Sequence, residues 1–323
     1  MNNKINDSQK PYVLIISGPT ASGKTDLSLQ LSTYFEIEII NVDVGQFYKP
    51  LSIGTAKPDW QKQKVVHHCF DLINEPKDLS AFEFSKIILK KINDIWSRKK
   101  IPVLVGGSLF YIKSLFFPPK DLPKFFNSET ENNFDSKIWD QLNKIDPKRA
   151  KELHKNDIYR IQRALDIWKK TGIKPSEYKP KFEANFNSRI IFINYDRDKL
   201  KEKINKRTEL MIKTGWIEET KKIMGTNWQK FLSIKKLIGY PEIIQWVEDG
   251  EKVEKLKDLI EKIQIKTHQY AKRQITFWKS LKKDLSGSFP LLIKYSELKN
   301  ISQKSILQLR KDIQNDLDYL YYK

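Results

Sequence analysis

The chain carries Gly18-Pro19-Thr20-Ala21-Ser22-Gly23-Lys24-Thr25 directly after an apolar run from Tyr12 to Ile16. The length and the β-branched residues of this run predict a buried parallel strand. After the motif, Leu27, Leu31 and Tyr34 share one face of a predicted helix. A strand, Gly-x4-Gly-Lys-Thr and a helix together form the context of a phosphate-binding loop. The sequence therefore predicts an α/β fold whose core is a P-loop NTPase-like parallel sheet.

The chemistry of this loop follows from its residue types. Its glycines, Gly18 and Gly23, let the backbone curl, so that the N–H groups of residues 20–25 can point toward an anion. The helix start adds a partial positive charge, and Lys24 adds a full one. The Thr25 hydroxyl can hold a Mg²⁺ ion. Residues 18–25 are therefore the predicted site for a di- or triphosphate.

Composition favours a polyanionic partner. The 323 residues include 59 Lys and Arg against 40 Asp and Glu, which gives a net charge of +19. Nucleic acid is the expected partner, with lysine-rich composition bias as the alternative. The single cysteine, Cys69, excludes an internal disulfide, and the polar residues 1–10 do not resemble a secretory signal. Because no apolar run approaches the length of a membrane span, we expect a soluble protein, and the single cysteine suits the cytoplasm. We also expect a monomer.

Two further predicted strands end in polar side chains. The run from Ile37 to Val42 ends at Asp43, and the run from Pro102 to Val105 ends in Gly106-Gly107-Ser108. The carboxyl ends of parallel strands face the ligand crevice of an open α/β sheet. Asp43 and Ser108 are therefore candidate site residues. A helix N-cap and a Mg²⁺ ligand remain alternative roles for Asp43.

Other stretches indicate structural roles or an insertion. Adjacent His67 and His68 would point to opposite faces of a strand, which favours burial or hydrogen bonding over metal binding. Ser80 and Glu83 form a predicted capping box. Prolines near residue 118 and a lack of strand patterns predict a helical insertion at 119–186, between core segments 1–118 and 187–323. Residues 144–181 carry twelve Lys and Arg against five Asp and Glu.

Basic side chains recur on the predicted helices. Arg160 and Arg163 share a face of the predicted helix from Asp157 to Lys169, where a solvated basic face and a nucleic-acid contact are both possible. After a strand at Arg189–Asn194, the next predicted helix carries Arg207. A long basic helix over 251–280, a strand at 291–295 and a helix at 303–321 complete the expected order.

In combination and order, these segments resemble the tRNA dimethylallyltransferase (tRNA isopentenyltransferase) family. The segments that carry the resemblance extend from residue 13 to residue 278: Gly18–Thr25, Asp43 with Gln46, Tyr48 and Lys49, Ile53-Gly-Thr-Ala-Lys-Pro58, His67-His68 with Asp71, Leu104-Val-Gly-Gly-Ser108 with Tyr111, Asn156-Asp157 with Arg160-x2-Arg163-Ala164-Leu165, Ile238-Gly-Tyr240 and Ala271-Lys-Arg-Gln-Ile275. The phosphate loop alone is unspecific, whereas the whole set is specific. Ser108 stands where the family usually has threonine.

The resemblance implies transfer of a dimethylallyl group from dimethylallyl diphosphate to the N6 amine of the adenosine 3′-adjacent to the anticodon of tRNA. It implies Mg²⁺ as cofactor, held by Thr25 with Ser108 as a second candidate ligand, and Asp43 as general base. Catalytic roles fall on Asp43, Ser108, Lys24 and Arg207. Predicted contacts to the anticodon stem-loop are Asp43, Val44, Gly45, Gln46, Tyr159, Arg160, Ile161, Gln162, Arg163, Lys236, Gly239, Tyr240 and Arg273.

Three other functions share parts of this pattern. A small-molecule P-loop kinase would use the phosphate loop but leaves the basic insertion unexplained. An isopentenyltransferase acting on free adenine nucleotides would use the same donor chemistry. A nucleic-acid-binding module would carry a vestigial loop, but the intact Lys24, Thr25, Asp43 and Ser108 argue against it.

Overall fold

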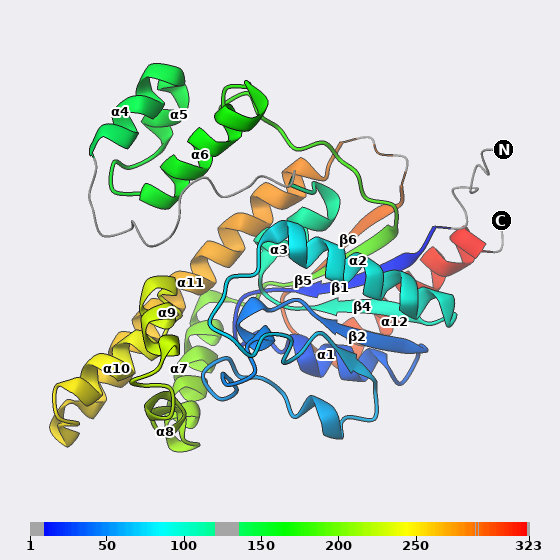
Figure 1. The fold of residues 1–323 in the computed structure, drawn as a ribbon. Coiled ribbons are helices and arrows are strands. Elements are labelled where there is room, and N and C mark those ends of the chain that lie inside the picture. The colour runs from blue at the N-terminus through cyan, green and yellow to red at the C-terminus, as the bar shows by residue number, and fades with distance from the viewer. Residues whose placement is uncertain (1–9, 120–135, 288, 290, 322–323) are drawn as a thin grey trace. The chain divides into compact units, whose positions relative to one another are not determined.

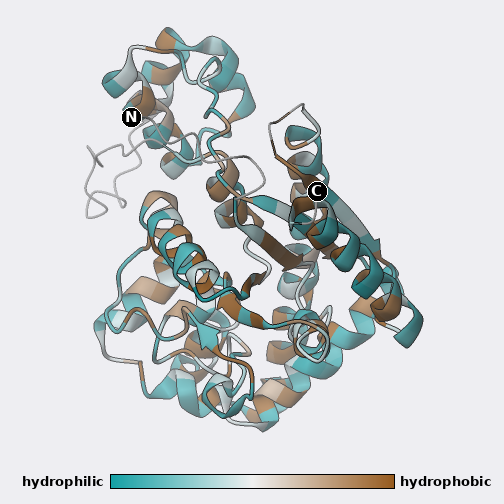
Figure 2. Ribbon diagram, turned by 90° about the vertical axis from the view of Figure 1, so that its right-hand side faces the viewer, coloured by the Kyte–Doolittle hydropathy of each residue, from teal (hydrophilic) through white to brown (hydrophobic). Residues whose placement is uncertain are grey.

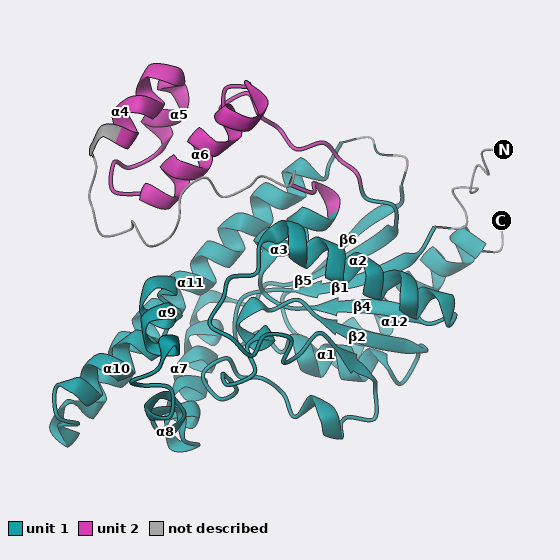
Figure 3. Ribbon diagram, in the orientation of Figure 1, with its two compact units in different colours: residues 1–115, 184–323 teal, residues 116–183 magenta. Residues whose placement is uncertain are grey.

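The computed structural model describes residues 10–119, 136–287, 289 and 291–321. The chain divides into two compact units, one formed by residues 1–115 with 184–323 and the other by residues 116–183 (Figure 3). The sequence placed the borders of the insertion at 119 and 186, within a few residues of this division. Most of the polar N-terminal stretch lies outside the described residues.

The larger unit is built on a parallel sheet of six strands in the order β3-β2-β4-β1-β5-β6 (Figure 1). The strands are β1 (Tyr12–Ser17), β2 (Ile37–Asn41), β3 (His67–His68), β4 (Ile101–Val105), β5 (Asn187–Ile193) and β6 (Ile293–Leu298). Every residue of β1, β2 and β5 is buried, as expected for strands covered on both faces. The predicted parallel P-loop-type sheet is confirmed.

Helices cover both faces of this sheet. Strand residues such as Leu14 and Ile39 pack with α1 (Lys24–Leu31) and α12 (Gln303–Tyr321) in one hydrophobic cluster. On the other side lie α2 (Ala81–Ser97) and α3 (Leu109–Phe116) (Figure 1). The predicted capping box at the start of α2 is present. In Figure 2 the central strands are largely hydrophobic, which agrees with their burial.

A group of helices follows β5 in the same unit. It comprises α7 (Arg197–Lys213), α8 (Trp216–Lys221), α9 (Asn227–Lys235), α10 (Tyr240–Glu248) and α11 (Leu256–Asp284). The predicted long basic helix is α11, and it packs along α7. The connection between α9 and α10 is short, because α9 reaches Lys235 and α10 begins at Tyr240.

The smaller unit contains α4 (Ser136–Ile145), α5 (Pro147–Glu152) and α6 (Ile158–Thr171). The three helices share a core that includes Leu142, Leu153 and Leu165. The indole of Trp139 donates hydrogen bonds to two carbonyls near the end of α5. Among the described residues, the predicted helical character of the insertion is therefore confirmed.

None of the helices in the described part of the chain has both the length and the apolar character that crossing a membrane requires.

Candidate active site

Three neighbouring strands bring the predicted site residues to one edge of the sheet. The phosphate loop follows β1, Asp43 follows β2, and Ser108 follows β4, which lies between them. The ends are joined by backbone hydrogen bonds from Val42 N to Val105 O (3.0 Å) and from Gly106 N to Ile16 O (3.2 Å). A Cβ on Gly106 would lie 2.5 Å from the carbonyl carbon of Val42, so only glycine permits this close approach.

The phosphate loop presents some of its backbone amides to the site. The N–H groups of Ala21, Gly23, Lys24 and Thr25 have no hydrogen-bond partner in the described part of the chain. Ala21 adopts a left-handed φ of 62°, as does Gly23 at 80°. Such a run of inward amides forms an anion-binding concavity. The Thr20 amide instead donates to Gln274 Oε1 (2.9 Å) and the Ser22 amide to Pro19 O (3.3 Å), so the expectation that all amides from 20 to 25 serve the ligand is wrong for these two residues in this structure.

Two cations flank the loop. Lys24 Nζ donates to the carbonyls of Gly18 (3.2 Å) and Pro19 (2.9 Å), and Arg207 on α7 donates to the Thr20 hydroxyl (3.4 Å). Burial lowers the pKa of Lys24 to about 8; the Asp43 carboxylate opposes this effect and Arg207 adds to it. Burial also lowers the pKa of Arg207, again opposed by Asp43. An anion bound here would relieve the mutual repulsion of Lys24 and Arg207.

A set of polar contacts fixes the turn that carries Asp43. The buried side chain of Asn41 accepts from Asp43 N (2.9 Å) and donates to Cys69 O (3.0 Å). Asp43 Oδ1 accepts a hydrogen bond from Gly45 N (3.3 Å) and caps the 3₁₀ turn at Val44–Phe47. One of the two carboxylate oxygens therefore has the N-cap role that the sequence left open. Asp43 Oδ2 has no hydrogen-bond partner among the described residues. That oxygen is therefore available for chemistry.

Ser108 contacts the same turn from the end of β4. Its hydroxyl accepts a hydrogen bond from Val44 N (3.2 Å), which links the end of β4 to the turn after β2. Neighbouring Tyr270 on α11 was not singled out from the sequence. Burial and the Asp43 carboxylate raise the pKa of Tyr270 above its ordinary value, although Arg273 and Ser108 act in the opposite direction. Tyr270 therefore stays a neutral hydroxyl beside the carboxylate.

A cavity of about 410 Å³ opens beside these groups. Its polar lining includes Asp43, Ser108 and Arg207, and the predicted residues Thr20, Ala21, Val44, Gly45, Lys236 and Arg273 also border it. Its apolar lining comes from the helices after β5 and includes Ile204, Met211, Trp216, Leu232 and Leu237. The cavity thus joins a charged edge to an apolar wall, as small-molecule sites commonly do.

A second cavity, of about 30 Å³, also borders Asp43. Lys24, Thr25 and Gln46 line it together with Asp43. Asp43 therefore borders both cavities, whereas Thr25 and Ser108 line different ones.

The oxygen ligands available near the phosphate loop fit Mg²⁺ bound together with a phosphate. No cluster of three or more His, Cys, Asp or Glu side chains suited to a metal ion occurs within the described ranges. Mg²⁺ at phosphate sites usually takes one or two protein ligands, with substrate oxygens and water completing its shell. The Thr25 hydroxyl in the first turn of α1, beside unpartnered amides, fits that pattern.

Gln274 joins the phosphate loop to the end of β4. It is almost fully buried; its Oε1 accepts from Thr20 N and its Nε2 donates to Gly107 O, both at 2.9 Å. A Cβ on Gly107 would come within 2.2 Å of Gln274 Nε2, so the amide needs a glycine there. The sequence offered one signal, a glutamine within the Ala271–Ile275 motif, but did not reveal this role.

A side chain of α8 binds the backbone at the start of the Ile53–Pro58 motif. One Glu219 carboxylate accepts hydrogen bonds from the backbone N–H groups of Ser52 (2.8 Å), Ile53 (2.7 Å) and Gly54 (3.0 Å). The Tyr240 hydroxyl donates to the same carboxylate (2.8 Å). Tyr240 is fully buried and Gly239 packs against Trp216, so a direct contact of the Tyr240 side chain with tRNA is contradicted by its burial. Its observed role is to position the loop.

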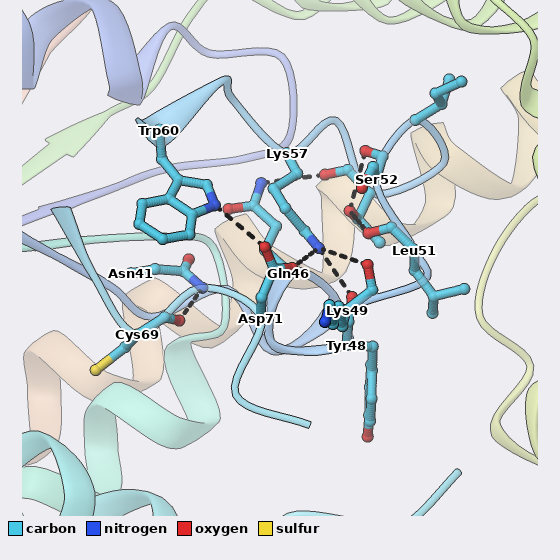
Figure 4. Close-up of polar contacts among 12 residues, drawn as sticks. Asn41, Gln46, Tyr48, Lys49, Leu51, Ser52, Lys57, Trp60, Cys69 and Asp71 are labelled. Carbon is cyan, nitrogen blue, oxygen red and sulfur yellow. Dashed lines mark hydrogen bonds and ion pairs between the residues drawn. The ribbon is translucent and has the colours of Figure 1, made fainter. Parts of the chain in front are cut away.

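Lys57 anchors the other end of that motif (Figure 4). Its nearly buried ammonium pairs with Asp71 and donates to Tyr48 O (2.9 Å), while the Trp60 indole donates to Asp71 (3.3 Å). Gln46 also binds this loop, donating from Nε2 to Thr55 O (3.1 Å). The residues of the motif are therefore tied together by buried charge and backbone contacts.

The predicted RNA-binding residues of α6 lie in the smaller unit. Tyr159 is 71% exposed and the Arg160 side chain 67% exposed, while Gln162 and Arg163 are partly buried. Ile161 is fully buried in the core of that unit, so a side-chain contact of Ile161 with RNA is contradicted by the packing. The helical period places it on the face opposite the solvent.

The fold and the site together define a P-loop protein. Its phosphate loop and the Asp43 carboxylate border a cavity with both polar and apolar lining. Residues 46–281 match the family model of the IPP transferases, so the chain belongs to the IPP transferase family. It is 33% identical over 281 residues to a tRNA dimethylallyltransferase of Alkaliphilus oremlandii, covering 84% of this chain and 89% of the relative. It is 37% identical over 276 residues to that of Pelagibacter ubique, covering 82% and 87%.

Solved structures agree with this assignment. The full-length tRNA isopentenylpyrophosphate transferase from Bacillus halodurans superposes with a TM-score of 0.66 at 25% identity, covering 97% of this chain and 98% of that one. A eukaryotic dimethylallyltransferase acting on tRNA gives a TM-score of 0.77 at 28% identity, covering 96% and 79%. The likeness extends over nearly the whole chain.

Proposed function

We propose that this protein transfers a dimethylallyl group from dimethylallyl diphosphate to the N6 amine of the adenosine immediately 3′ of the anticodon in tRNA. The observation that best supports this reaction is the position of Asp43. It lies beside the phosphate loop, it borders the 410 Å³ cavity, and one of its carboxylate oxygens has no hydrogen-bond partner among the described residues. The family relationship supports the same reaction, because the relatives named above are tRNA dimethylallyltransferases.

The phosphate loop would bind the leaving group. As the C1–O bond of the donor breaks, negative charge grows on the diphosphate, and preorganised positive charge stabilises it. The unpartnered loop amides, Lys24 and Arg207 supply that charge. Mg²⁺, held by the Thr25 hydroxyl with diphosphate oxygens and water, would neutralise further charge on the same group. The apolar wall around Met211 and Trp216 fits the hydrocarbon.

The carboxylate would activate the nucleophile. An adenine amine is a poor nucleophile, because its lone pair is delocalised into the ring. As the N6–C1 bond forms, N6 must lose a proton, and Asp43 Oδ2 is placed to accept it. Ser108 holds the turn through Val44 N and so fixes the direction of the carboxylate. The proton ends on Asp43, and the electron pair of the C1–O bond leaves with the diphosphate.

Basic and aromatic residues would bind the RNA. Reaching a buried donor requires an unstacked base, which proteins stabilise with aromatic or arginine surfaces and phosphate contacts. Arg273 and Lys236 border the cavity and are exposed. Exposed Tyr159 and Arg160 offer such a surface on the insertion, residues 119–186 in our assignment, with Arg163 one turn on. We further propose that the protein acts as a cytoplasmic monomer.

Mass spectrometry of tRNA nucleosides after incubation with dimethylallyl diphosphate and Mg²⁺ tests the reaction. A product heavier by one dimethylallyl group on adenosine is expected. Modification of AMP in preference to tRNA would identify a free-nucleotide isopentenyltransferase instead. Phosphoryl transfer from ATP without alkylation would identify a kinase.

Asp43→Asn tests the base assignment. Asparagine keeps the size of the side chain but cannot take the proton, so single-turnover transfer at saturating substrates should fall by about 10²–10⁴-fold. The dissociation constants of donor and tRNA should change little. If donor affinity collapses while the saturated rate survives, Asp43 is a metal ligand or a structural residue.

A further inference from the structure

His67 is buried behind the site and is not used by the mechanism above. It lies on β3, paired in register with Ile39 of β2, and is 7% exposed. Its neighbour His68 points to different surroundings, with Nε2 2.7 Å from the Glu38 carboxylate. The two histidines therefore have separate roles despite being adjacent.

One ring nitrogen of His67 lacks a partner. Nδ1 lies 2.7 Å from the carbonyl oxygen of Val65, which can only accept, so Nδ1 carries the hydrogen. Burial and the neighbouring His68 lower the pKa of His67, against an opposing effect of the Val65 carbonyl, so the ring is neutral and Nε2 holds a lone pair. Nε2 is buried and accepts no hydrogen bond from the described residues. A buried acceptor of this kind requires a partner.

The structure provides room for one. His67 lines the 30 Å³ cavity together with Lys24, Thr25, Asp43 and Gln46. A water molecule needs about 10–15 Å³ of such space and two to four polar partners. The volume exceeds this need, and the lining residues carry a carboxylate, a hydroxyl and an ammonium besides the imidazole.

We propose that a water molecule in this cavity donates one hydrogen bond to His67 Nε2 and the other to the Asp43 carboxylate. Asp43 Oδ1 is already held by Gly45 N on one side. The bridge would fix the carboxylate from the second side, so that its reactive oxygen faces the larger cavity. His67 is then a positioning residue for Asp43, an inference that rests on the proposed role of Asp43 as base.

Two substitutions separate the ring nitrogens. His67→Asn keeps a donor where Nδ1 meets Val65 but removes the acceptor at Nε2, whereas His67→Gln keeps an acceptor near Nε2. At saturating donor and tRNA, we expect the single-turnover rate of His67→Asn to fall by about 10–100-fold, the size of effect that misplacing a reacting group has. His67→Gln should stay within about threefold of wild type. His68→Gln is the matched control and should transfer at the wild-type rate.

Several outcomes would overturn the proposal. The first is a wild-type transfer rate in His67→Asn. The second is an equal loss of transfer rate in both His67 variants, with equally lowered melting temperatures. The third is a change only in the Mg²⁺ concentration that donor binding needs. A crystal structure gives a readout that does not depend on turnover. It should show a water within about 3.2 Å of both His67 Nε2 and Asp43 in wild type. Absence of that water refutes the bridge even if tRNA transfer is active, while inactive wild-type enzyme refutes the proposed function alone.

Discussion

Gln274→Ala should weaken both the fold and donor binding, because a single buried amide joins the phosphate loop to the end of β4. The change removes the acceptor for Thr20 N and the donor for Gly107 O, both at 2.9 Å. Each buried group left without a partner costs about 1–3 kcal/mol. The free energy of unfolding should therefore fall by about 2–6 kcal/mol, which at about 2 °C per kcal/mol lowers the melting temperature by about 4–12 °C.

Donor binding should weaken in the same variant. Without the Gln274 contact, Thr20 and the loop amides after it are no longer held in one arrangement, so ordering them becomes part of the cost of binding. We expect the dissociation constant of dimethylallyl diphosphate to rise by about tenfold, a coupling of about 1.4 kcal/mol. Calorimetric titration with the donor and Mg²⁺, beside thermal and urea unfolding, measures both effects.

Two variants on the same helix serve as controls. Gln269→Ala makes the same chemical change at an exposed position of α11 and should leave stability within about 0.5 kcal/mol of wild type. Gln274→Glu keeps an acceptor for Thr20 N but places a buried carboxylate against Gly107 O, so at neutral pH it should be destabilised at least as much as Gln274→Ala. The reasoning is refuted if Gln274→Ala is as stable as Gln269→Ala and binds the donor normally.

Three further measurements test the site and the insertion. Lys24→Ala should lower the transfer rate by about 10²–10³-fold, because it removes the full charge of the loop; normal turnover would mean that the diphosphate binds elsewhere. Because the pKa of Lys24 lies near 8, its ammonium is lost at higher pH, so donor affinity should fall as pH rises from about 7 to about 9. Lys24→Arg, which stays charged, should show a flatter profile. Affinity for an anticodon stem-loop should fall about 100-fold between 50 and 200 mM salt if about five phosphates are neutralised, and Arg160→Ala with Arg163→Ala should reduce that slope; an unchanged slope would place the RNA site off α6.

The elements that local patterns specify were predictable from the sequence. Strands β1, β2, β4 and β5 and the capped helix α2 were predicted, because apolar runs and caps involve residues close in the chain. Parallel strands then require their carboxyl ends to share one edge, which is enough to predict that Asp43 and Ser108 lie beside the phosphate loop. Topology alone was enough for that inference.

The contacts that support the site could not be predicted in this way. Gln274 meets Thr20 across 254 residues, and Glu219 meets Ser52 across 167, so no local pattern connects them. The short helices α8 and α9 were also missed. The burial of the Tyr240 and Ile161 side chains was not foreseen either, because a motif records that a residue matters and leaves open whether it does so from the surface or from the core.

The apolar lining of the larger cavity that Asp43 borders favours alkyl transfer over phosphoryl transfer. A kinase must bring its acceptor to a phosphorus atom, within reach of Lys24 and the loop amides. Here the carboxylate also borders a cavity lined by apolar residues such as Ile204 and Met211, which a phosphoryl acceptor would not need. A donor with its diphosphate on the loop would extend its hydrocarbon along that lining and present a carbon atom near Asp43. The nucleophile that Asp43 activates would therefore attack carbon, and the loop would serve to hold the departing diphosphate.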